Sequence, residues 1–340
     1  MKQLRFLISR IDRIGDVVLS TPLPREIKIK YPNSFVAVLV KNYTKDIYLN
    51  NPFVDAIITY DNLNKTEKSF MELVREIKQY KFSHAFMLLP NEKLNYVLFM
   101  SGIKYRVGVG HKLYQFLTFT KYVDRKKYNP LRHEADYCAD MIRKIGINVR
   151  SILPEIHLTE IEKTKVNSIR NNLIKGNQKL IGINISSGNS APNLNKDEYK
   201  KLILTLKKNI NYKIAVMDNN VLPDLDNIDG VLYPNKGNTL RDSIINLASL
   251  DLLISNSTGP MHICAALKVP TLSFFCPLTA CSPKLWGPLG NKSEIIVPEQ
   301  NYCNTQCPID PKKCDYSKEG GLRAEFIVEK VNSFLKNLAG

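Results

Sequence analysis

The first loop that could do chemistry runs from Ile8 to Pro22 and carries Asp16 directly after Gly15. The loop follows an apolar run that predicts a strand, and it leads into a predicted helix. A carboxylate in a first helical turn is stabilised by the helix dipole. Asp16 is therefore a candidate general base, and the alternative is a favourable first-turn acid without catalytic function. The dinucleotide-binding motif G-x-G-x-x-G is absent from this loop, and a carboxylate at the helix N-terminus would repel phosphate. We therefore do not expect a nucleotide to bind here.

A second loop has the opposite character, because no acidic residue occurs between strand residue Ile254 and His262. Small side chains let backbone N–H groups approach an anion, and the N-terminus of the following helix supplies partial positive charge. His262 lies in the first turn, where its imidazole could reach a phosphate or a sugar hydroxyl. The alternative is a capped helix with a satisfied histidine. The predicted pyrophosphate site is the loop Ser255–Pro260, with Ser257, Thr258, Gly259 and Pro260 as the candidate contacts.

Three further features carry weaker signals. The loop Asn184–Ser190, which includes Ser187, offers hydroxyl and amide donors after another predicted strand. Asp224-Leu225-Asp226 has the spacing of a metal clamp, but it lies in a Pro- and Asn-rich connection where a solvated loop is favoured. Cys303, Cys307 and Cys314 lack an evident fourth ligand. We therefore expect neither a metal nor a cofactor.

A basic and aromatic run, His111–Tyr122, could stack nucleic-acid bases, but it belongs to no recognised nucleic-acid module. Its apolar residues are expected to lie in the core with polar residues at the rim. The net charge of +16 is concentrated in residues 1–150, which hold 26 Lys and Arg against 14 Asp and Glu. This charge favours an anionic partner and does not identify it.

The elements that must position these loops alternate between strands and helices, which predicts an α/β fold with parallel sheets covered on both faces. Length favours two domains. Predicted strands are Leu4–Ile8, Phe35–Val40, Ala56–Thr59, His84–Leu89, Leu180–Ile185, Lys213–Met217, Leu252–Ile254 and Thr271–Phe275. Predicted helices are Asp16–Lys30, Lys65–Gln79, His133–Ile145, Thr159–Lys175, Asn195–Lys208, Leu240–Ser249, Met261–Leu267 and Arg323–Leu335.

An extended, Pro-containing segment near Leu158 predicts the domain boundary. The domains are residues 1–158 and 159–322, followed by an amphipathic helix within 323–340. The apolar run Phe6–Ile8 is too short for a signal peptide, and the seven cysteines fit a reducing compartment. We expect a cytoplasmic protein.

Three segments, taken in this order, resemble glycosyltransferase family 9, the ADP-heptose:lipopolysaccharide heptosyltransferases. They are Arg10–Val17, Gly102–Gly108 and Ser257–Leu267. The resemblance implies the GT-B fold, in which two Rossmann-like domains with parallel sheets face each other across a cleft. The first domain would bind the acceptor and the second the nucleotide-sugar, while the last helix would pack back on the first domain.

The same resemblance implies an inverting, metal-independent transfer in which Asp16 deprotonates the acceptor. Implied donor contacts are Ser187, Leu240, Ser257, Thr258, Gly259, Pro260 and His262. Implied acceptor contacts are Arg10, Arg13, Lys104, Arg106 and Lys112. The implied partners are a nucleotide-sugar and an anionic, lipid-linked saccharide, with peripheral contact at the cytoplasmic face of the inner membrane and no nucleic acid.

The chain departs from the family pattern at three places, one of which is that no acid within Asp218–Asp224 matches the ribose-binding acid of the family. Pro192 stands where many relatives carry a phosphate-binding lysine, and Ser257 replaces a frequent aspartate. A catalytically weakened protein that binds a sugar-nucleotide or glycan is therefore the alternative to an active transferase building lipopolysaccharide core or another surface glycan.

Overall fold

The computed structural model describes residues 3–188, 191–307, 310 and 313–339. The chain divides into two compact units, Met1–His157 and Leu158–Gly340, which we call unit 1 and unit 2. The sequence predicts this boundary one residue later, after Leu158. Each unit contains one parallel sheet with its own hydrophobic core.

Unit 1 contains a six-stranded sheet in the order β3-β2-β1-β4-β5-β6, in which every paired neighbour is parallel. The strands are β1 Arg5–Arg10, β2 Phe35–Val40, β3 Ala56–Thr59, β4 His84–Met87, β5 Tyr105–Val109 and β6 Lys121–Val123. Strands β1 and β2 are almost wholly buried, as their continuous apolar runs predict. Strands β5 and β6 were not among the predicted strands, because one is interrupted by Gly108 and the other is only three residues long.

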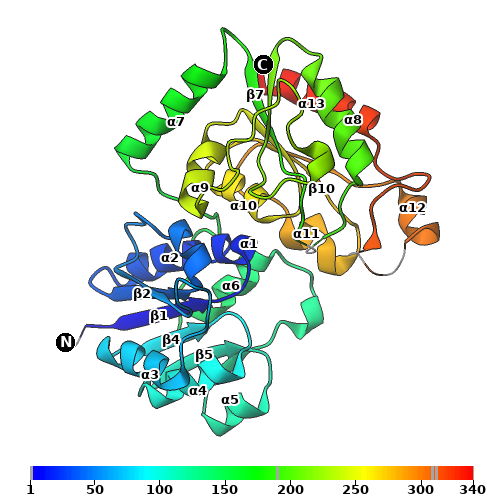
Figure 1. Ribbon diagram of the computed structural model, residues 1–340. Coiled ribbons are helices and arrows are strands. Elements are labelled where there is room, and N and C mark those ends of the chain that lie inside the picture. The colour runs from blue at the N-terminus through cyan, green and yellow to red at the C-terminus, as the bar shows by residue number, and fades with distance from the viewer. Residues whose placement is uncertain (1–2, 189–190, 308–309, 311–312, 340) are drawn as a thin grey trace. The chain divides into compact units, whose positions relative to one another are not determined.

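Helices cover both faces of this sheet (Figure 1), with α2 packed beside α6 on one face and α3, α4 and α5 packed in series on the other. The helices are α1 Ile14–Val18, α2 Pro22–Lys30, α3 Phe70–Gln79, α4 Glu92–Met100, α5 Leu113–Leu117 and α6 Glu134–Arg143, with 3₁₀ turns at Asn42–Ile47 and Lys126–Tyr128. The sequence predicts one helix over Asp16–Lys30, but the structure has two. Pro22 has no N–H to continue the first helix and instead begins the second.

Unit 2 contains a five-stranded sheet in the order β11-β10-β9-β7-β8, again parallel throughout. The strands are β7 Lys179–Ile183, β8 Tyr212–Val216, β9 Leu252–Asn256, β10 Thr271–Phe274 and β11 Ser293–Ile296. The helices are α7 Glu160–Leu173, α8 Lys196–Lys207, α9 Leu240–Ala248, α10 Gly259–Ala266, α11 Pro283–Trp286, α12 Gln300–Thr305 and α13 Ala324–Ala339, with 3₁₀ turns at Pro223–Leu225 and Thr279–Cys281.

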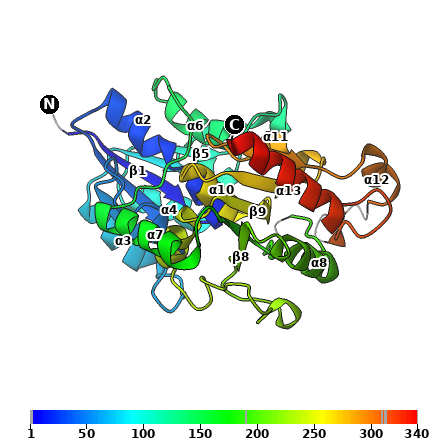
Figure 2. The ribbon, with the colours of Figure 1, turned by 90° about the horizontal axis from the view of Figure 1, so that it is seen from above.

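The apolar stripe of α13 is part of the core of unit 2. Ile327, Val331 and Leu335 lie in the same buried cluster as the strands of this unit, and α13 packs against α8 (Figure 2). The sequence predicts that this helix packs back on the first domain. The buried stripe covers the sheet of its own unit, and packing of the helix on the first domain stays a prediction.

Each sheet has one point where the strand order reverses. In unit 1, β1 separates β2 from β4, and in unit 2, β7 lies between β8 and β9. Successive connections leave from opposite sides at such a point, so the loops at the carboxyl ends of the two strands diverge and leave room for a ligand. The candidate loops therefore follow β1 and β4 in unit 1, and β7 and β9 in unit 2.

Within the described residues, we find no helix that is both long enough and apolar enough to span a bilayer.

Candidate active site

Asp16 lies directly beyond the carboxyl end of β1, where the strand order of unit 1 reverses. It is in the first turn of α1 and its side chain is 16% exposed. The last residue of β1, Arg10, donates from Nη2 to Asp16 Oδ1 at 2.5 Å. The carboxylate is thus partly open to solvent and held in one orientation by a guanidinium.

Arg10 holds more than this one carboxylate. Its Nε donates to Asp12 at 2.8 Å and its Nη1 to Glu134 at 3.1 Å, while Arg125 also pairs with Glu134 at 2.7 Å. Burial opposes a charge on Arg10, but Cys138 and the three carboxylates raise its pKa well above the ordinary value. Arg10 therefore stays a cation and fixes the acids around it.

Asp12 is a site residue that sequence reasoning missed. Burial raises its pKa from 3.8 to about 6, although Arg10 acts against that shift. The sequence does not show that the pKa of this loop residue is raised, because the burial that raises it arises only in the folded protein. Asp12 consequently titrates much closer to neutrality than an ordinary aspartate.

Three of the predicted acceptor contacts lie in surroundings that do not favour that role. Arg10 is 3% exposed and its guanidinium pairs with Asp12, Asp16 and Glu134. Arg106 is 7% exposed and donates to the backbone carbonyls of Ile103 and Thr118. Lys104 is exposed, but it precedes β5 and therefore lies at the amino ends of the strands, away from their carboxyl ends.

The other two predicted acceptor contacts remain available. Arg13 is exposed and immediately precedes α1, and Lys112 is exposed between β5 and α5. Both residues follow the carboxyl end of a strand of unit 1, as Asp16 does. Their role as acceptor contacts stays a prediction.

In unit 2, the predicted phosphate loop lies where the strand order reverses, after β9. Thr258 precedes α10, and its side chain does not cap the helix. Its hydroxyl instead donates to Asn184 Oδ1 at 3.0 Å, on the loop after β7. The two loops beside the reversal point are therefore joined through their side chains, while the amide end of α10 keeps no side-chain cap.

Asp218, just beyond β8, fixes the loop after β7. Its carboxylate accepts from Asn184 Nδ2 at 2.8 Å, from Ile185 N at 2.7 Å and from Ser186 N at 3.0 Å and Oγ at 2.5 Å. Burial raises the pKa of Asp218, and these donors oppose the rise. Hydrogen bonds thus link Asp218 to Asn184 and Asn184 to Thr258. We call these three residues the polar relay.

A second set of buried hydrogen bonds lies at the end of β9, where the phosphate loop begins. Asn256, at the end of β9, donates to the Tyr199 hydroxyl at 2.7 Å and to Asn193, and Tyr199 itself donates to Asn193 at 2.8 Å. Sequence reasoning missed the bonds within both sets because their members are far apart in the chain. Asn184, Asp218 and Asn256 lie at or just beyond the end of an apolar strand, which is the available signal.

The remaining predicted donor contacts lie in the same unit. Ser257, Gly259 and Pro260 are partly exposed at the start of α10, and Ser187 is partly exposed after β7. Leu240 is the first residue of α9, beyond a loop that Asn219 holds to the end of β8 by a bond to Asn238 O at 2.7 Å. His262 is 3% exposed, and its contact to a donor stays a prediction. Asn189 and Ser190, which belong to the predicted loop Asn184–Ser190, lie outside the described residues.

Pro192 and the segment Asp224–Asp226 have clear surroundings in the structure. Pro192 is buried, so this position presents no cation. Asp224 and Asp226 do not converge, because Asp224 pairs with Lys196 and Asp226 with Lys236, both at 2.6 Å. The solvated loop is therefore the better description of this segment.

The thiol cluster contains a fourth member that the sequence does not reveal. Burial raises the pKa of Cys303 to about 11, and Cys276, Cys307 and Cys314 add to that rise as neighbours. Cys276 follows β10 and is remote in sequence from the other three. Among the residues that the structure describes, no group of three or more His, Cys, Asp or Glu side chains is arranged to hold a metal ion.

Part of unit 2 matches a known family by sequence. The match covers residues 238–313, and the family is described as glycosyltransferase family 9 (heptosyltransferase). The matched segment begins just before α9 and includes the phosphate loop, α10 and most of the thiol cluster.

Similar proteins cover the chain more fully. A Haemophilus influenzae protein named "Putative glycosyltransferase" is 28% identical, over 98% of this chain and 97% of that protein. Lipopolysaccharide heptosyltransferase 2 of Salmonella typhimurium is 22% identical, over 86% and 88%. The structure of E. coli ADP-heptose lps heptosyltransferase II has a TM-score of 0.74 at 17% identity, covering 99% of this chain and 100% of that one. These matches confirm the predicted fold class and the resemblance to family 9.

Proposed function

We propose that this chain, a heptosyltransferase-like protein of glycosyltransferase family 9, transfers a sugar with inversion from a nucleotide-sugar to the hydroxyl of an anionic saccharide. The proposal divides the reaction between the units. Unit 2 binds the nucleotide diphosphate that leaves, and unit 1 supplies the base that activates the acceptor.

The polar relay is the observation that carries the donor half of this proposal. It fixes the loops after β7 and β9 on either side of the strand reversal. Beside them, the N-terminus of α10 has no side-chain cap and no acidic residue in its first turn. A diphosphate bound there would accept hydrogen bonds from backbone N–H groups and gain from the helix dipole.

In the acceptor half, Asp16 takes the proton of the acceptor hydroxyl. The oxygen then bonds to the anomeric carbon of the donor while the bond from that carbon to the phosphate oxygen breaks. The nucleotide diphosphate leaves with the electron pair, so no covalent intermediate with the protein forms and no metal is required. The bond from Arg10 to Asp16 supports this role, because a base must be held in a defined orientation.

The proposed substrates follow from the names of the relatives. One is a lipopolysaccharide heptosyltransferase and another an ADP-heptose heptosyltransferase, so we propose an ADP-linked heptose or related sugar as the donor. The acceptor would be the phosphorylated core of a lipid-linked saccharide, which Arg13 and Lys112 would contact. We propose that the enzyme works at the cytoplasmic face of the inner membrane as a peripheral protein.

A second candidate is a protein that binds a sugar-nucleotide without efficient transfer. The buried Pro192 favours it, because the phosphate-binding cation of many relatives is missing at that position. The two candidates share the donor site and differ in turnover.

The decisive experiment measures donor binding and transfer separately. A thermal-shift panel of ADP-, UDP- and GDP-sugars identifies the donor, and sugar transfer to extracted lipopolysaccharide core is then assayed with that donor. Donor binding with turnover supports the transferase, and donor binding without turnover supports the second candidate. Absence of stabilisation by every nucleotide-sugar contradicts both.

A further inference from the structure

The segment from Leu113 to Thr120 exposes large apolar residues and buries polar ones. Leu113, Phe116, Leu117 and Phe119 are 74%, 78%, 55% and 84% exposed, whereas Gln115, Thr118 and Thr120 are at most 7% exposed. We call the four apolar residues the α5 surface. The sequence predicts that these residues lie in the core, and the structure corrects this. A soluble fold gains nothing from such an arrangement, since burial of the aromatic residues would stabilise it.

The buried polar residues hold this segment firmly in its inverted orientation. Thr118 accepts from Asn95 at 2.8 Å and Thr120 donates to the same side chain at 3.1 Å. Arg106 donates to the carbonyl oxygen of Thr118. The α5 surface is therefore displayed by a rigid support rather than by a loose loop.

The backbone conformation of Phe119 is a second indication that the exposure of this side chain is not incidental. Its φ is 54°, in the left-handed region that normally favours glycine after a helix. A bulky residue in this region is strained, and nothing in the packing of unit 1 compensates for it, because the ring is exposed. A side chain kept outside the core at such a cost is expected to meet something there.

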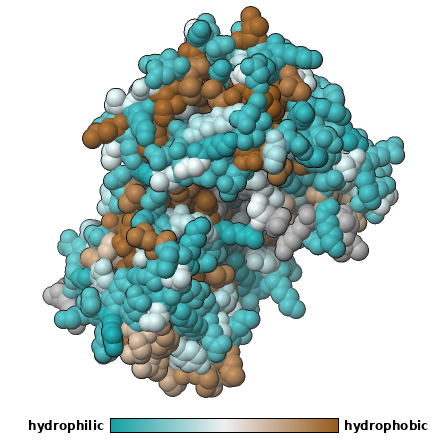
Figure 3. Space-filling view, viewed as in Figure 1, coloured by the Kyte–Doolittle hydropathy of each residue, from teal (hydrophilic) through white to brown (hydrophobic). Residues whose placement is uncertain are grey.

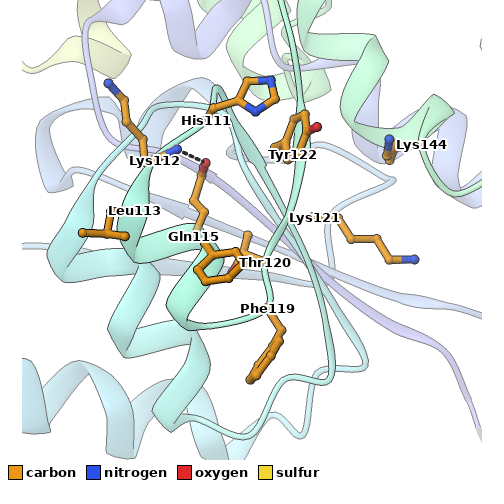
Figure 4. Close-up of a pocket in the computed structure, with 10 residues that line it drawn as sticks. His111, Lys112, Leu113, Gln115, Phe119, Thr120, Lys121, Tyr122 and Lys144 are labelled. Atoms are coloured by element: carbon orange, nitrogen blue, oxygen red, sulfur yellow. Dashed lines mark hydrogen bonds between the residues drawn. The ribbon is translucent and has the colours of Figure 1, made fainter.

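Cations accompany the apolar side chains. An open cavity of about 810 Å³ beside them is lined by Lys112, Lys121 and Lys144 (Figure 4). Asp124 lies 3.7 Å from His111, which also lines the cavity. Figure 3 shows the apolar atoms gathered at the end of unit 1 where Figure 1 draws α5.

We propose that the α5 surface docks on a bilayer containing anionic lipid, with its apolar side chains in the interface and the lysines against lipid phosphates. Aromatic and leucine side chains beside lysines are the composition that binds such an interface. The excess of 26 basic over 14 acidic residues in the first 150 residues adds long-range attraction. The inference rests on the proposed function in one respect, which is that the acceptor lies at the membrane.

The test measures lipid binding directly, so its failure is distinct from failure of transfer. The full chain is sedimented with phosphatidylcholine vesicles that either contain or lack phosphatidylglycerol. We expect binding only with phosphatidylglycerol, at least tenfold weaker for F116S/F119S. Leu63→Ser is the matched control, because Leu63 is 85% exposed elsewhere in unit 1, and it should bind as the wild type does.

A second variant keeps the test independent of the aromatic residues. K112Q/K121Q should weaken binding by more than tenfold at low salt, and high salt should weaken wild-type binding as well. Folding of each variant is checked by its melting temperature. The proposal is wrong if the wild type ignores phosphatidylglycerol, or if F116S/F119S binds like Leu63→Ser. It is also wrong if the wild type is a dimer that F116S/F119S dissociates while lipid binding is unchanged, since a second copy would then be the occupant.

Discussion

Arg10 donates to Asp16 at 2.5 Å from the last position of β1, while it also pairs with Asp12 and Glu134. The sheet thus fixes the guanidinium, and the guanidinium fixes the carboxylate. We expect Arg10 to position Asp16, so its substitution should affect both stability and the proposed base.

The first prediction concerns Asp16 itself. Asp16→Asn keeps the size of the side chain but removes the base, so turnover should fall by about 10²- to 10⁴-fold while donor affinity stays unchanged. Transfer assays and donor titration on the same protein check this. Asp224→Asn, an exposed acid paired only with Lys196, should behave like the wild type. Unchanged turnover in Asp16→Asn would remove the general-base assignment.

The second prediction separates Arg10 from Arg13. Arg10→Ala leaves three carboxylates without their shared cation, so the free energy of unfolding should fall by roughly 3–5 kcal/mol. Denaturant unfolding measures this change. Arg13→Ala removes an exposed residue and should leave stability nearly unchanged while raising the KM for the acceptor. Equal stability losses in the two variants would contradict the buried, shared role of Arg10.

The third prediction is a pH dependence that belongs to Asp12. Its pKa is raised by burial from 3.8 to about 6, so the unfolded chain releases this proton at lower pH than the folded chain does. The contribution of Asp12 to stability is therefore largest below pH 4, falls as the pH rises through 6, and is constant above it. The stability of Asp12→Asn relative to the wild type should accordingly rise across this window. A difference that does not change with pH would contradict the raised pKa.

The fourth prediction addresses the polar relay. Asp218→Ala leaves the amide of Asn184 and the N–H groups of the next two residues without their acceptor, which should cost about 2–4 kcal/mol of stability and weaken donor binding. Thr258→Val removes the hydroxyl that donates to Asn184 and to the carbonyl of Asn256, at about 1 kcal/mol, and should weaken donor binding less. Unfolding curves and donor titrations measure both effects. Full donor affinity in Asp218→Ala would separate the relay from the donor site.

The fifth prediction concerns strain at Phe119. Glycine adopts a φ of 54° without the steric cost that phenylalanine bears, so Phe119→Gly should stabilise the protein by about 1 kcal/mol. A rise in melting temperature of several degrees would show this. The same variant should bind anionic vesicles less well, which would reveal a trade between stability and docking.

The sequence predicts the parallel-sheet architecture well because long apolar runs such as Phe35–Val40 carry a strong signal. It also locates the acidic loop and the acid-free loop, since each follows such a strand. It does not reveal the environment of Arg10, Arg106 or the α5 surface. A charge looks the same in sequence whether it is exposed or tied to buried carbonyls, and an apolar residue looks the same whether it lies inside or outside.

The polar relay could not be predicted for a different reason. Asp218 and Thr258 are brought together only because β8, β7 and β9 are neighbours in the sheet, which is a matter of strand order. Local pattern does not determine that order. Cys276 joins the thiol cluster for the same reason.

The place of α13 in the core of unit 2 has a consequence for synthesis on the ribosome. Residues 1–157 contain every element of unit 1, so that unit can fold while the rest of the chain is still being translated. The core of unit 2 instead combines Ile181 with Leu335. The core of this unit is complete only when residues near 335 have left the exit tunnel, and part of one apolar face of its sheet stays uncovered until then. This unit is therefore the one we expect to depend on chaperones.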